Sequence, residues 1–317
     1  MIPYIWFEQA RQRIVKHIIH TPLTYDSANN WHFKWENRQV TGSFKARGAL
    51  NKIISLAPWE LERGIVTASA GNHGQGVALA GRLVKARVTV FVSETAVPEK
   101  IRSIRKLGAT ILTVAGGYEV AERAGIEYAA ANGSTWVSAY NDVQVIAGQG
   151  TIALEDLADR PQLSSATWVV PVGGGGLISG IAAALKSAPE KSIATRVVGV
   201  QSQASAFMHH LYHLGTQEGV LDLPSLADGL AGAVEHNSIT IPIVKKYVDD
   251  LILVSEEETA GAIAYAWRNY QEKIEGSAAA ALAALLQRNI SDRTIVCLIS
   301  GGNIEPEIHQ RIITSYS

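Results

Sequence analysis

One lysine stands in a setting that could make its amine reactive. Lys45 lies in the stretch TGSFKARGAL, with the aromatic Phe44 directly before it and glycines at Gly42 and Gly48. An amine shielded from water can attack a carbonyl group or accept a proton, because burial disfavours its charged form. Most lysines are instead solvated charges on a helix surface. This stretch alone leaves both interpretations open.

A second stretch has the features of an anion site. The segment SAGNHGQG follows an apolar run and opens a helical pattern. The backbone N–H groups of Gly71, Asn72 and His73 are expected at the helix N-terminus, where the helix dipole favours negative charge. The Asn72 side chain adds a group that both donates and accepts hydrogen bonds. The alternative is a glycine-rich turn with an Asn–His cap.

Four consecutive glycines, Gly173–Gly176, follow the run TWVVPV and form another candidate anion site. Such a run costs conformational entropy, so a close approach to the backbone or a positive φ is expected, and successive N–H groups can cradle a phosphate. A dinucleotide site fits less well, because Ile178 or Ser179 stands where the third glycine of G-x-G-x-x-G belongs. The next strand ends in Gln201, where a ribose-binding acid is expected.

The stretch SGGN, which begins at Ser300, follows the apolar run RTIVCLI. A serine at this place can hydrogen-bond a group in a crevice, and a turn with an N-cap is the alternative. Together, the four stretches offer a phosphate cradle, a lysine, a partner for a ring nitrogen and a partner for a ring hydroxyl. Pyridoxal phosphate, with its phosphate, aromatic ring and aldehyde, requires these four features. The sequence therefore predicts pyridoxal phosphate as the cofactor.

Apolar strand-like runs alternate with helical patterns along the chain. Strands are expected at 64–68, 87–92, 109–114, 167–172, 195–200, 250–254 and 293–299. Helices are expected at 73–84, 98–108 and 118–131, and from the glycine run to about Lys186. Continuous apolar strands are buried on both faces, so the alternation predicts an α/β fold with parallel strands flanked by helices. Ligands bind at the carboxyl ends of such strands, where the three loops stand.

The composition is that of a globular protein with few special demands. The 317 residues allow two domains, and the net charge of −1 provides no basic field for nucleic acid or an anionic membrane. A single cysteine, Cys297, excludes an internal disulfide framework, and we expect it to be buried. The start MIPYIWFEQARQR lacks the pattern of a signal peptide, and no apolar run is long enough to cross a bilayer. We therefore expect a cytoplasmic protein that binds neither nucleic acid nor membrane.

In these motifs the chain resembles the fold-type II pyridoxal-phosphate enzymes, and within them the serine/threonine dehydratase (threonine ammonia-lyase) and serine racemase family. The matching stretches, in family order, are TGSFKARGA, SAGNHGQGVA, YNDVQVIAGQGTIALE, VPVGGGGLISGI, ADGLAG and SGGN. The resemblance implies a tryptophan synthase β-like α/β fold of two domains, each a mostly parallel open twisted sheet flanked by helices. It assigns residues 1–53 and 144–317 to a large cofactor-binding domain and 54–143 to a small domain. It also implies a homodimer or a dimer of dimers.

The same resemblance implies roles for individual residues. Lys45 is the catalytic, Schiff-base lysine, and Phe44 packs on the cofactor ring. Asn72 binds the ring 3-hydroxyl and Ser300 the pyridine nitrogen, while Glu275 in KIEGSAAAA matches a glutamate near the cofactor. The cofactor phosphate is assigned to Gly173, Gly174, Gly175, Gly176 and Leu177. The substrate α-carboxylate is assigned to Ser69, Ala70, Gly71, Asn72 and His73.

Two departures from the family pattern shape the expected reaction. A serine racemase resembles this chain but has a second serine before GNHG, which supplies a proton on the face opposite the lysine. Here that residue is Ala70, so elimination is favoured over racemisation, which needs an acid on the second face. Gln201 and Phe207 stand where relatives have acidic ligands of a divalent cation, so no metal is expected there.

The expected activity is a pyridoxal-phosphate-dependent β-elimination. A 3-hydroxy amino acid, L-threonine or L-serine, would be dehydrated and deaminated to a 2-oxo acid and ammonia. Two alternatives stay open at this point. One is an amino-acid racemase, and the other is a dehydratase of a different 3-hydroxy amino acid such as hydroxyaspartate.

Overall fold

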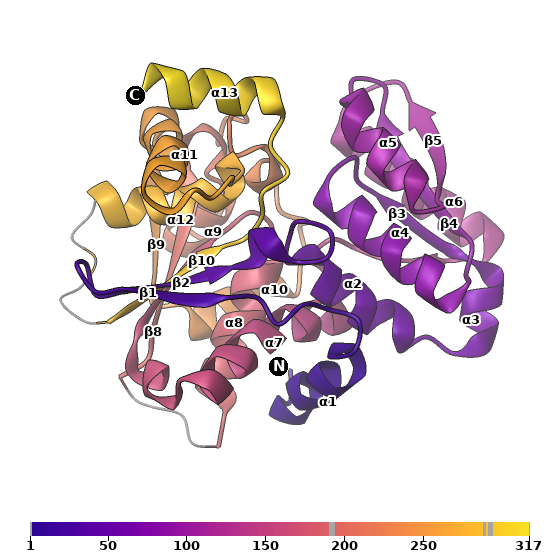
Figure 1. The fold of residues 1–317 in the computed structure, drawn as a ribbon. Coiled ribbons are helices and arrows are strands. Elements are labelled where there is room, and N and C mark those ends of the chain that lie inside the picture. The colour runs from indigo at the N-terminus through magenta and orange to yellow at the C-terminus, as the bar shows by residue number, and fades with distance from the viewer. Residues whose placement is uncertain (1, 190–193, 288–289, 291–293, 317) are drawn as a thin grey trace.

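The computed structural model describes residues 2–189, 194–287, 290 and 294–316. This part of the chain forms two separate β-sheets with helices on both faces of each (Figure 1). The larger sheet has six strands in the order β1-β2-β10-β7-β8-β9. Its strands are β1 (Leu23–Asp26), β2 (Trp31–Trp35), β7 (Thr167–Pro171), β8 (Arg196–Ser202), β9 (Asp250–Val254) and β10 (Ile295–Ile299).

Alternate residues along β10 pack against different sets of helices. Val296 and Leu298 lie in the core cluster that includes α7 and α8, whereas Cys297 and Ile299 lie in the cluster of α11 and α12. Successive side chains of a strand point to opposite faces, so both faces of this sheet are buried. The helices outside the smaller sheet are α1 (Tyr4–Ile14), α2 (Lys45–Ile54), α7 (Val143–Asp159), α8 (Gly176–Ser187), α9 (Phe207–His213), α10 (Thr240–Tyr247), α11 (Glu256–Tyr270), α12 (Gly276–Gln287) and α13 (Pro306–Ser315).

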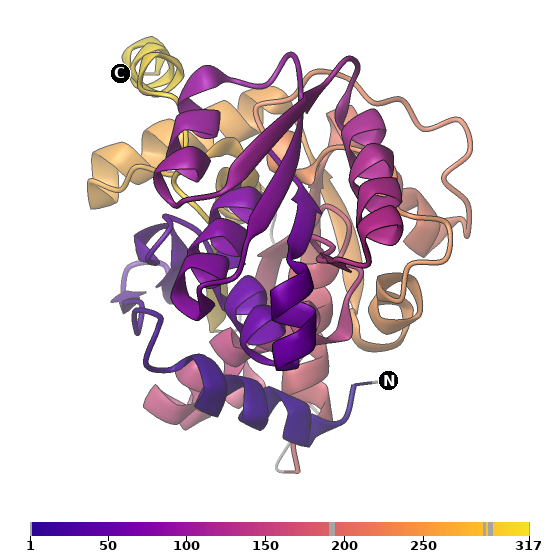
Figure 2. The same ribbon diagram turned by 90° about the vertical axis from the view of Figure 1, so that its right-hand side faces the viewer.

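The smaller sheet has four parallel strands in the order β5-β4-β3-β6, and Figure 2 brings it to the front. Val90 of β4 packs in one core cluster, while Phe91 packs in another together with residues of α6. The elements are α3 (Pro58–Arg63), β3 (Ile65–Ala68), α4 (Asn72–Val84), β4 (Val88–Ser93), α5 (Pro98–Lys106), β5 (Thr110–Val114), α6 (Tyr118–Asn132) and β6 (Thr135–Trp136). The predicted α/β class, with mostly parallel sheets, is confirmed.

The expected strands and helices are present, and their ends differ from the prediction by two residues or fewer. The strand expected at 293–299 begins at Ile295, and Arg293 lies outside the described residues. All strands of the smaller sheet fall within 54–143, and those of the larger sheet fall outside this range. The domain boundaries themselves stay a prediction.

The hairpin of β1 and β2 was not among the expected strands. β1 pairs antiparallel with β2 at the edge of the larger sheet, and β2 pairs parallel with β10. The sequence WHFKW hides this strand from a hydrophobic pattern, because His32 and Lys34 are buried although they are polar. Trp31 and Trp35 are four residues apart on β2 and therefore lie on one face of it, and both pack in the cluster of α11 and α12.

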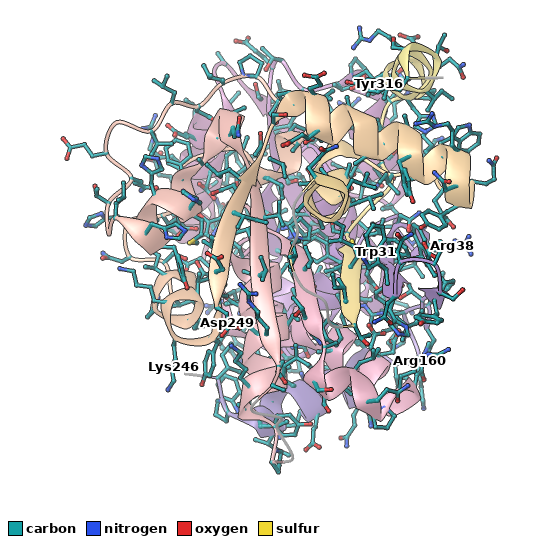
Figure 3. The ribbon with its side chains drawn as sticks, turned by 90° about the vertical axis from the view of Figure 1, so that its left-hand side faces the viewer. Trp31, Arg38, Arg160, Lys246, Asp249 and Tyr316 are labelled. Carbon is teal, nitrogen blue, oxygen red and sulfur yellow. The ribbon has the colours of Figure 1, made fainter. Side chains whose placement is uncertain are left out.

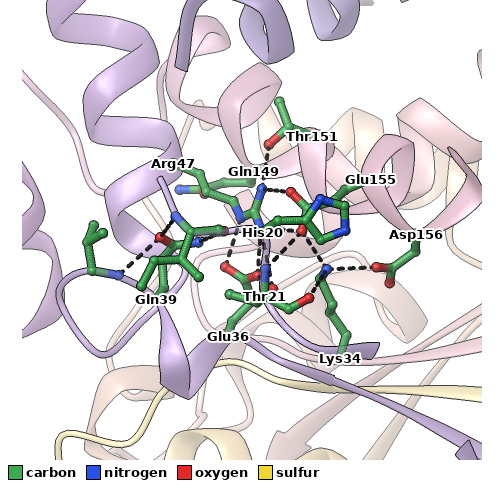
Figure 4. A network of polar contacts seen from close by, with 12 residues as sticks. His20, Thr21, Lys34, Glu36, Gln39, Arg47, Gln149, Thr151, Glu155 and Asp156 are labelled. Atoms are coloured by element: carbon green, nitrogen blue, oxygen red, sulfur yellow. Dashed lines mark hydrogen bonds and ion pairs between the residues drawn. The ribbon is translucent and has the colours of Figure 1, made fainter. Parts of the chain in front are cut away.

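A buried cluster of charged side chains connects β2, α2 and α7 (Figure 4). Arg47, two residues after Lys45, donates to Glu36 (Nη2–Oε1 2.7 Å) and to Glu155 (Nη1–Oε2 3.0 Å). The Lys34 amine lies 2.6 Å from Glu155 and 2.9 Å from Asp156. Three carboxyl groups thus face two basic groups, and the cluster holds the first turns of α2 against the larger sheet.

The face opposite the smaller sheet is shown with side chains in Figure 3. Trp31 and Arg38 lie near one edge of the larger sheet, and Lys246 and Asp249 near the other. Among the described residues, no helix is both long and apolar enough to cross a bilayer. Within the same residues, no three or more His, Cys, Asp or Glu side chains are grouped so that they could hold a metal ion.

The charged cluster predicts a pH-dependent stability. Burial raises the pKa of Asp156 from 3.8 to about 7, against the opposing effect of Lys34. The folded protein therefore retains a proton that the unfolded chain releases, and stability falls as the pH rises from 3.8 to about 7. We expect Asp156→Asn to remove this slope and to raise the melting temperature at pH 8 relative to the wild type, as measured by calorimetry across pH.

Glu155→Gln is the matched comparison. Burial raises the pKa of Glu155, but Arg47 and Lys34 outweigh this and lower it, so the group is charged in the fold. Its removal leaves buried cations short of a partner, and we expect a loss of about 3 kcal/mol of stability. A Glu155→Gln protein as stable as Asp156→Asn would contradict this account of the cluster.

Candidate active site

The loop after β6, residues 137–141, contacts three of the motifs singled out in the sequence. The Lys45 amine donates to the Ala139 carbonyl at 2.9 Å, and the His73 ring lies 3.1 Å from the Val137 carbonyl. The Tyr140 ring lies against the glycine run, since a Cβ on Gly174 would come within 2.6 Å of it. This loop therefore brings the lysine, the SAGNHGQG segment and the four glycines to one place.

The surroundings of Lys45 withdraw its amine from water. Loss of hydration lowers the pKa of Lys45 to about 8, although the charge of Glu275 opposes the shift. The Phe44 ring centroid lies 5.2 Å from the amine nitrogen. The Phe44 N–H donates to the carbonyl of Ser300 at 3.0 Å, so the residue predicted to bind the pyridine nitrogen lies next to the lysine segment. A fraction of the amine is thus neutral near physiological pH, far more than for a lysine with the ordinary pKa of 10.5.

The glycine run forms a cradle of open backbone donors. Gly175 has φ +85° and is the N-cap of α8. Among the described residues, the N–H groups of 174–177 donate to no protein acceptor, and the α8 dipole points at the same space. The positive φ of Gly175 disfavours a side chain there, and a Cβ on Gly176 would lie 2.9 Å from the Tyr140 Cα. The Thr240 hydroxyl anchors the Gly174 carbonyl at 2.8 Å. This arrangement fits a phosphate.

A second set of open donors lies at the N-terminus of α4. The Ser69 hydroxyl accepts from the Gly71 N–H at 3.1 Å and folds the loop back. In the described part of the chain, the N–H groups of 72–74 have no protein acceptor, which fits a carboxylate. Burial and the nearby Lys45 lower the pKa of His73 to about 3, so its ring is neutral. Ala70 packs against the core of the smaller sheet.

Glu275 and Asn72 lie in one hydrogen-bond network with Asn303. Glu275 Oε1 accepts from Asn72 Nδ2 at 2.7 Å, and Oε2 accepts from the Asn303 N–H at 3.1 Å. Asn303 Nδ2 in turn donates to Asn72 Oδ1 at 2.6 Å. Burial and the charge of Asp228 raise the pKa of Glu275 to about 7, while these hydrogen bonds oppose the rise. Glu275 therefore supports Asn72 directly.

A family model described as pyridoxal-phosphate dependent enzyme matches residues 14–301 of the chain. The chain belongs to this family. Pyridoxal phosphate is thus its cofactor, as the motifs predict, and the open donors around the glycine run and the dehydrated amine of Lys45 fit that group. The fold-type II architecture is confirmed as well.

Known proteins similar to this member of the family include lyases and racemases. An L-threonine ammonia-lyase from Thermotoga maritima is 40% identical over 95% of this chain and 76% of its own length. A catabolic L-threonine dehydratase from Staphylococcus aureus is 38% identical over 94% and 88%. The crystal structure of serine racemase from Dictyostelium discoideum has a TM-score of 0.86 and 34% identity, covering 96% of this chain and 99% of that one.

The structure brings the predicted site residues of this pyridoxal-phosphate enzyme together at the loop 137–141 and in the network of Asn72, Glu275 and Asn303. Their individual roles toward cofactor and substrate stay predictions. Two supporting residues, Tyr140 and Asn303, were missed, although both lie in quoted motifs, YND and SGGN. At the two positions where relatives have acidic cation ligands, this chain has Gln201 and Phe207, and both side chains are buried. Gln201 Oε1 accepts from the backbone N–H of His209 at 2.9 Å, and Phe207 packs in the core.

The partly buried Lys45 and the fully buried Lys34 allow a direct test of the Lys45 environment. Burial opposes the charge of Lys34 too, but the carboxylates of Asp156 and Glu155 outweigh burial and raise its pKa. We expect reductive methylation of the cofactor-free protein, followed by peptide mass spectrometry, to modify Lys45 with half-maximal rate near pH 8. Lys34 should stay unmodified over the same range. Equal reactivity of the two lysines would contradict the assignment of Lys45 as the low-pKa amine.

Proposed function

We propose that this enzyme catalyses β-elimination of a 3-hydroxy amino acid, L-threonine or L-serine, to a 2-oxo acid and ammonia. The observation that carries the proposal is the dehydrated amine of Lys45, held by the Ala139 carbonyl beside two open anion sites. The similar L-threonine ammonia-lyase and dehydratase support it. Bound pyridoxal phosphate supplies the electron sink for this chemistry.

The chain's own residues bind the substrate and move its proton. The open N–H groups at the start of α4, those of Asn72 and His73 among them, bind the α-carboxylate through hydrogen bonds and the helix dipole. This contact sets the substrate Cα toward Lys45. With a pKa of about 8, the Lys45 amine has a substantial neutral fraction near neutral pH and accepts the Cα proton. The His73 ring is neutral, so it does not draw the substrate carboxylate away from the backbone N–H groups.

Elimination is proposed over racemisation because of Ala70. The side chain is a methyl group that packs with the core of the smaller sheet, so it has no proton to deliver to Cα. The similar serine racemase keeps racemisation as the rival outcome of the tests below. Hydroxyaspartate is a further substrate to assay.

We also propose where the enzyme is located in the cell and how it assembles. We place the enzyme in the cytoplasm, since its similar relatives are metabolic enzymes. We propose a homodimer or a dimer of dimers, and a cofactor-binding domain of 1–53 with 144–317 beside a small domain of 54–143.

Loss of the Lys45 amine should abolish the reaction. We expect the wild type, supplied with pyridoxal phosphate, to release 2-oxo acid from L-threonine and L-serine, and Lys45→Ala to be slower by at least about a thousandfold, because the general base is lost. Release of 2-oxo acid is measured spectrophotometrically, with exposed Lys16→Ala as the control. Full turnover by Lys45→Ala would overturn the assignment.

A hydroxyl at position 70 should allow proton delivery to the face of the substrate Cα opposite Lys45. We expect Ala70→Ser to convert a measurable fraction of L-serine to D-serine, because the new hydroxyl can deliver a proton to the other side of Cα. Chiral chromatography of unreacted serine is the measurement, and Ala70→Gly, which lacks the hydroxyl, is the matched control. D-serine production by the wild type would favour the racemase rival.

A further inference from the structure

The carboxamide of Asn303 has only one possible orientation. Its Nδ2 lies 2.8 Å from the backbone carbonyl of Thr41, and a carbonyl oxygen can only accept. The atom facing Thr41 must therefore be the N–H-bearing nitrogen. The same Nδ2 lies 2.6 Å from Asn72, so both of its hydrogens are donated, one to each partner.

This orientation dictates that of Asn72. Because Asn303 donates to it, the facing atom of Asn72 must be the acceptor Oδ1. The Asn72 Nδ2 then faces Glu275 Oε1 at 2.7 Å, where an N–H meets an acceptor. The two contacts agree, and a flipped amide would place oxygen against oxygen at Glu275. Among the described residues, the second N–H of Asn72 Nδ2 has no protein partner.

Glu275 completes the network as a double acceptor. Its Oε2 accepts from the backbone N–H of Asn303 at 3.1 Å, while its own N–H donates to the Gly301 carbonyl at 3.1 Å. The Gly302 N–H donates to the Gly42 carbonyl at 2.9 Å. Asn303 thus connects the lysine segment, the start of α12 and, through Asn72, the start of α4 in the smaller sheet.

We propose that Asn303 is a positioning residue that, together with Glu275, locks the Asn72 carboxamide with its N–H end toward the cofactor. Asn72 then offers a donor, and not an acceptor, to the 3-oxygen of the cofactor ring. A donor stabilises the deprotonated ring oxygen relative to the ring hydroxyl. The inference rests on the predicted contact between Asn72 and the ring oxygen. It adds the positioning role of Asn303 and the deprotonated state of the ring oxygen, which this contact alone does not specify.

Asn303→Asp tests the lock with almost no change in shape. The new carboxylate cannot donate to Thr41 or to Asn72, and it competes with Glu275 for the N–H groups of Asn72. We expect about tenfold weaker binding of pyridoxal phosphate, because buried hydrogen bonds are lost. We also expect the visible spectrum of the bound cofactor to shift toward its shorter-wavelength, ring-hydroxyl band across a pH titration.

The control is Asn269→Asp, the same chemical change at an exposed helix position where the side chain donates to the Tyr265 carbonyl. It should leave both the dissociation constant and the spectrum unchanged. The melting temperature of each cofactor-free variant is measured alongside. An Asn303→Asp protein with the wild-type spectrum and affinity would overturn the proposal.

Glu275→Gln is the second variant, in case Asn303→Asp fails to fold. Its amide can accept from Asn72 or from the Asn303 N–H but not from both, so the same spectral shift is expected. A wild-type spectrum in Glu275→Gln would refute the lock. If the wild type itself bound no cofactor, the proposed function would fail together with this inference. Normal binding and turnover by the wild type, with unchanged variants, would defeat the inference alone.

Discussion

The site depends on a lysine amine that is held away from water and that, within the described part of the chain, contacts no carboxylate directly. Lys34 shows the usual solution for a buried lysine, in which carboxylates at 2.6 and 2.9 Å raise the pKa. Lys45 has the neutral carbonyl of Ala139 instead, and its pKa falls to about 8. The two side chains differ little in chemistry, so their partners decide which one is a base. The charged cluster around Arg47 then holds the helix that begins at Lys45.

Open helix N-termini supply the rest of the site. α4 follows β3 of the smaller sheet and α8 follows β7 of the larger one, so each starts at the carboxyl end of a parallel strand. Unpaired N–H groups at such ends attract anions. The loop 137–141 lies between them, since it contacts His73 on one side and the glycine run, through Tyr140, on the other.

Local signals carried most of what could be predicted. The central strands could be predicted because a strand that is buried on both faces appears in the sequence as a continuous apolar run. The glycine run 173–176 was visible in the sequence because contact with Tyr140 and the positive φ of Gly175 leave no place for side chains, so glycine is required. The strand β2 was not found, since its buried His32 and Lys34 are polar. Asn303 was also missed, because its effect depends on Asn72, which lies 231 residues away.

The sequence by itself determined the cofactor, the fold class and the residues on which chemistry is expected. Each of these follows from short stretches of sequence, in which the residue types alone indicate the backbone conformation and the available side-chain chemistry. Only the tertiary structure decided the state of those residues. Burial makes His73 neutral and lowers the pKa of Lys45, and the orientation of the Asn72 amide follows from Glu275 and Asn303, which are distant in the sequence. Desolvation and hydrogen-bond polarity are properties of the folded surroundings, so no stretch of sequence contains them alone.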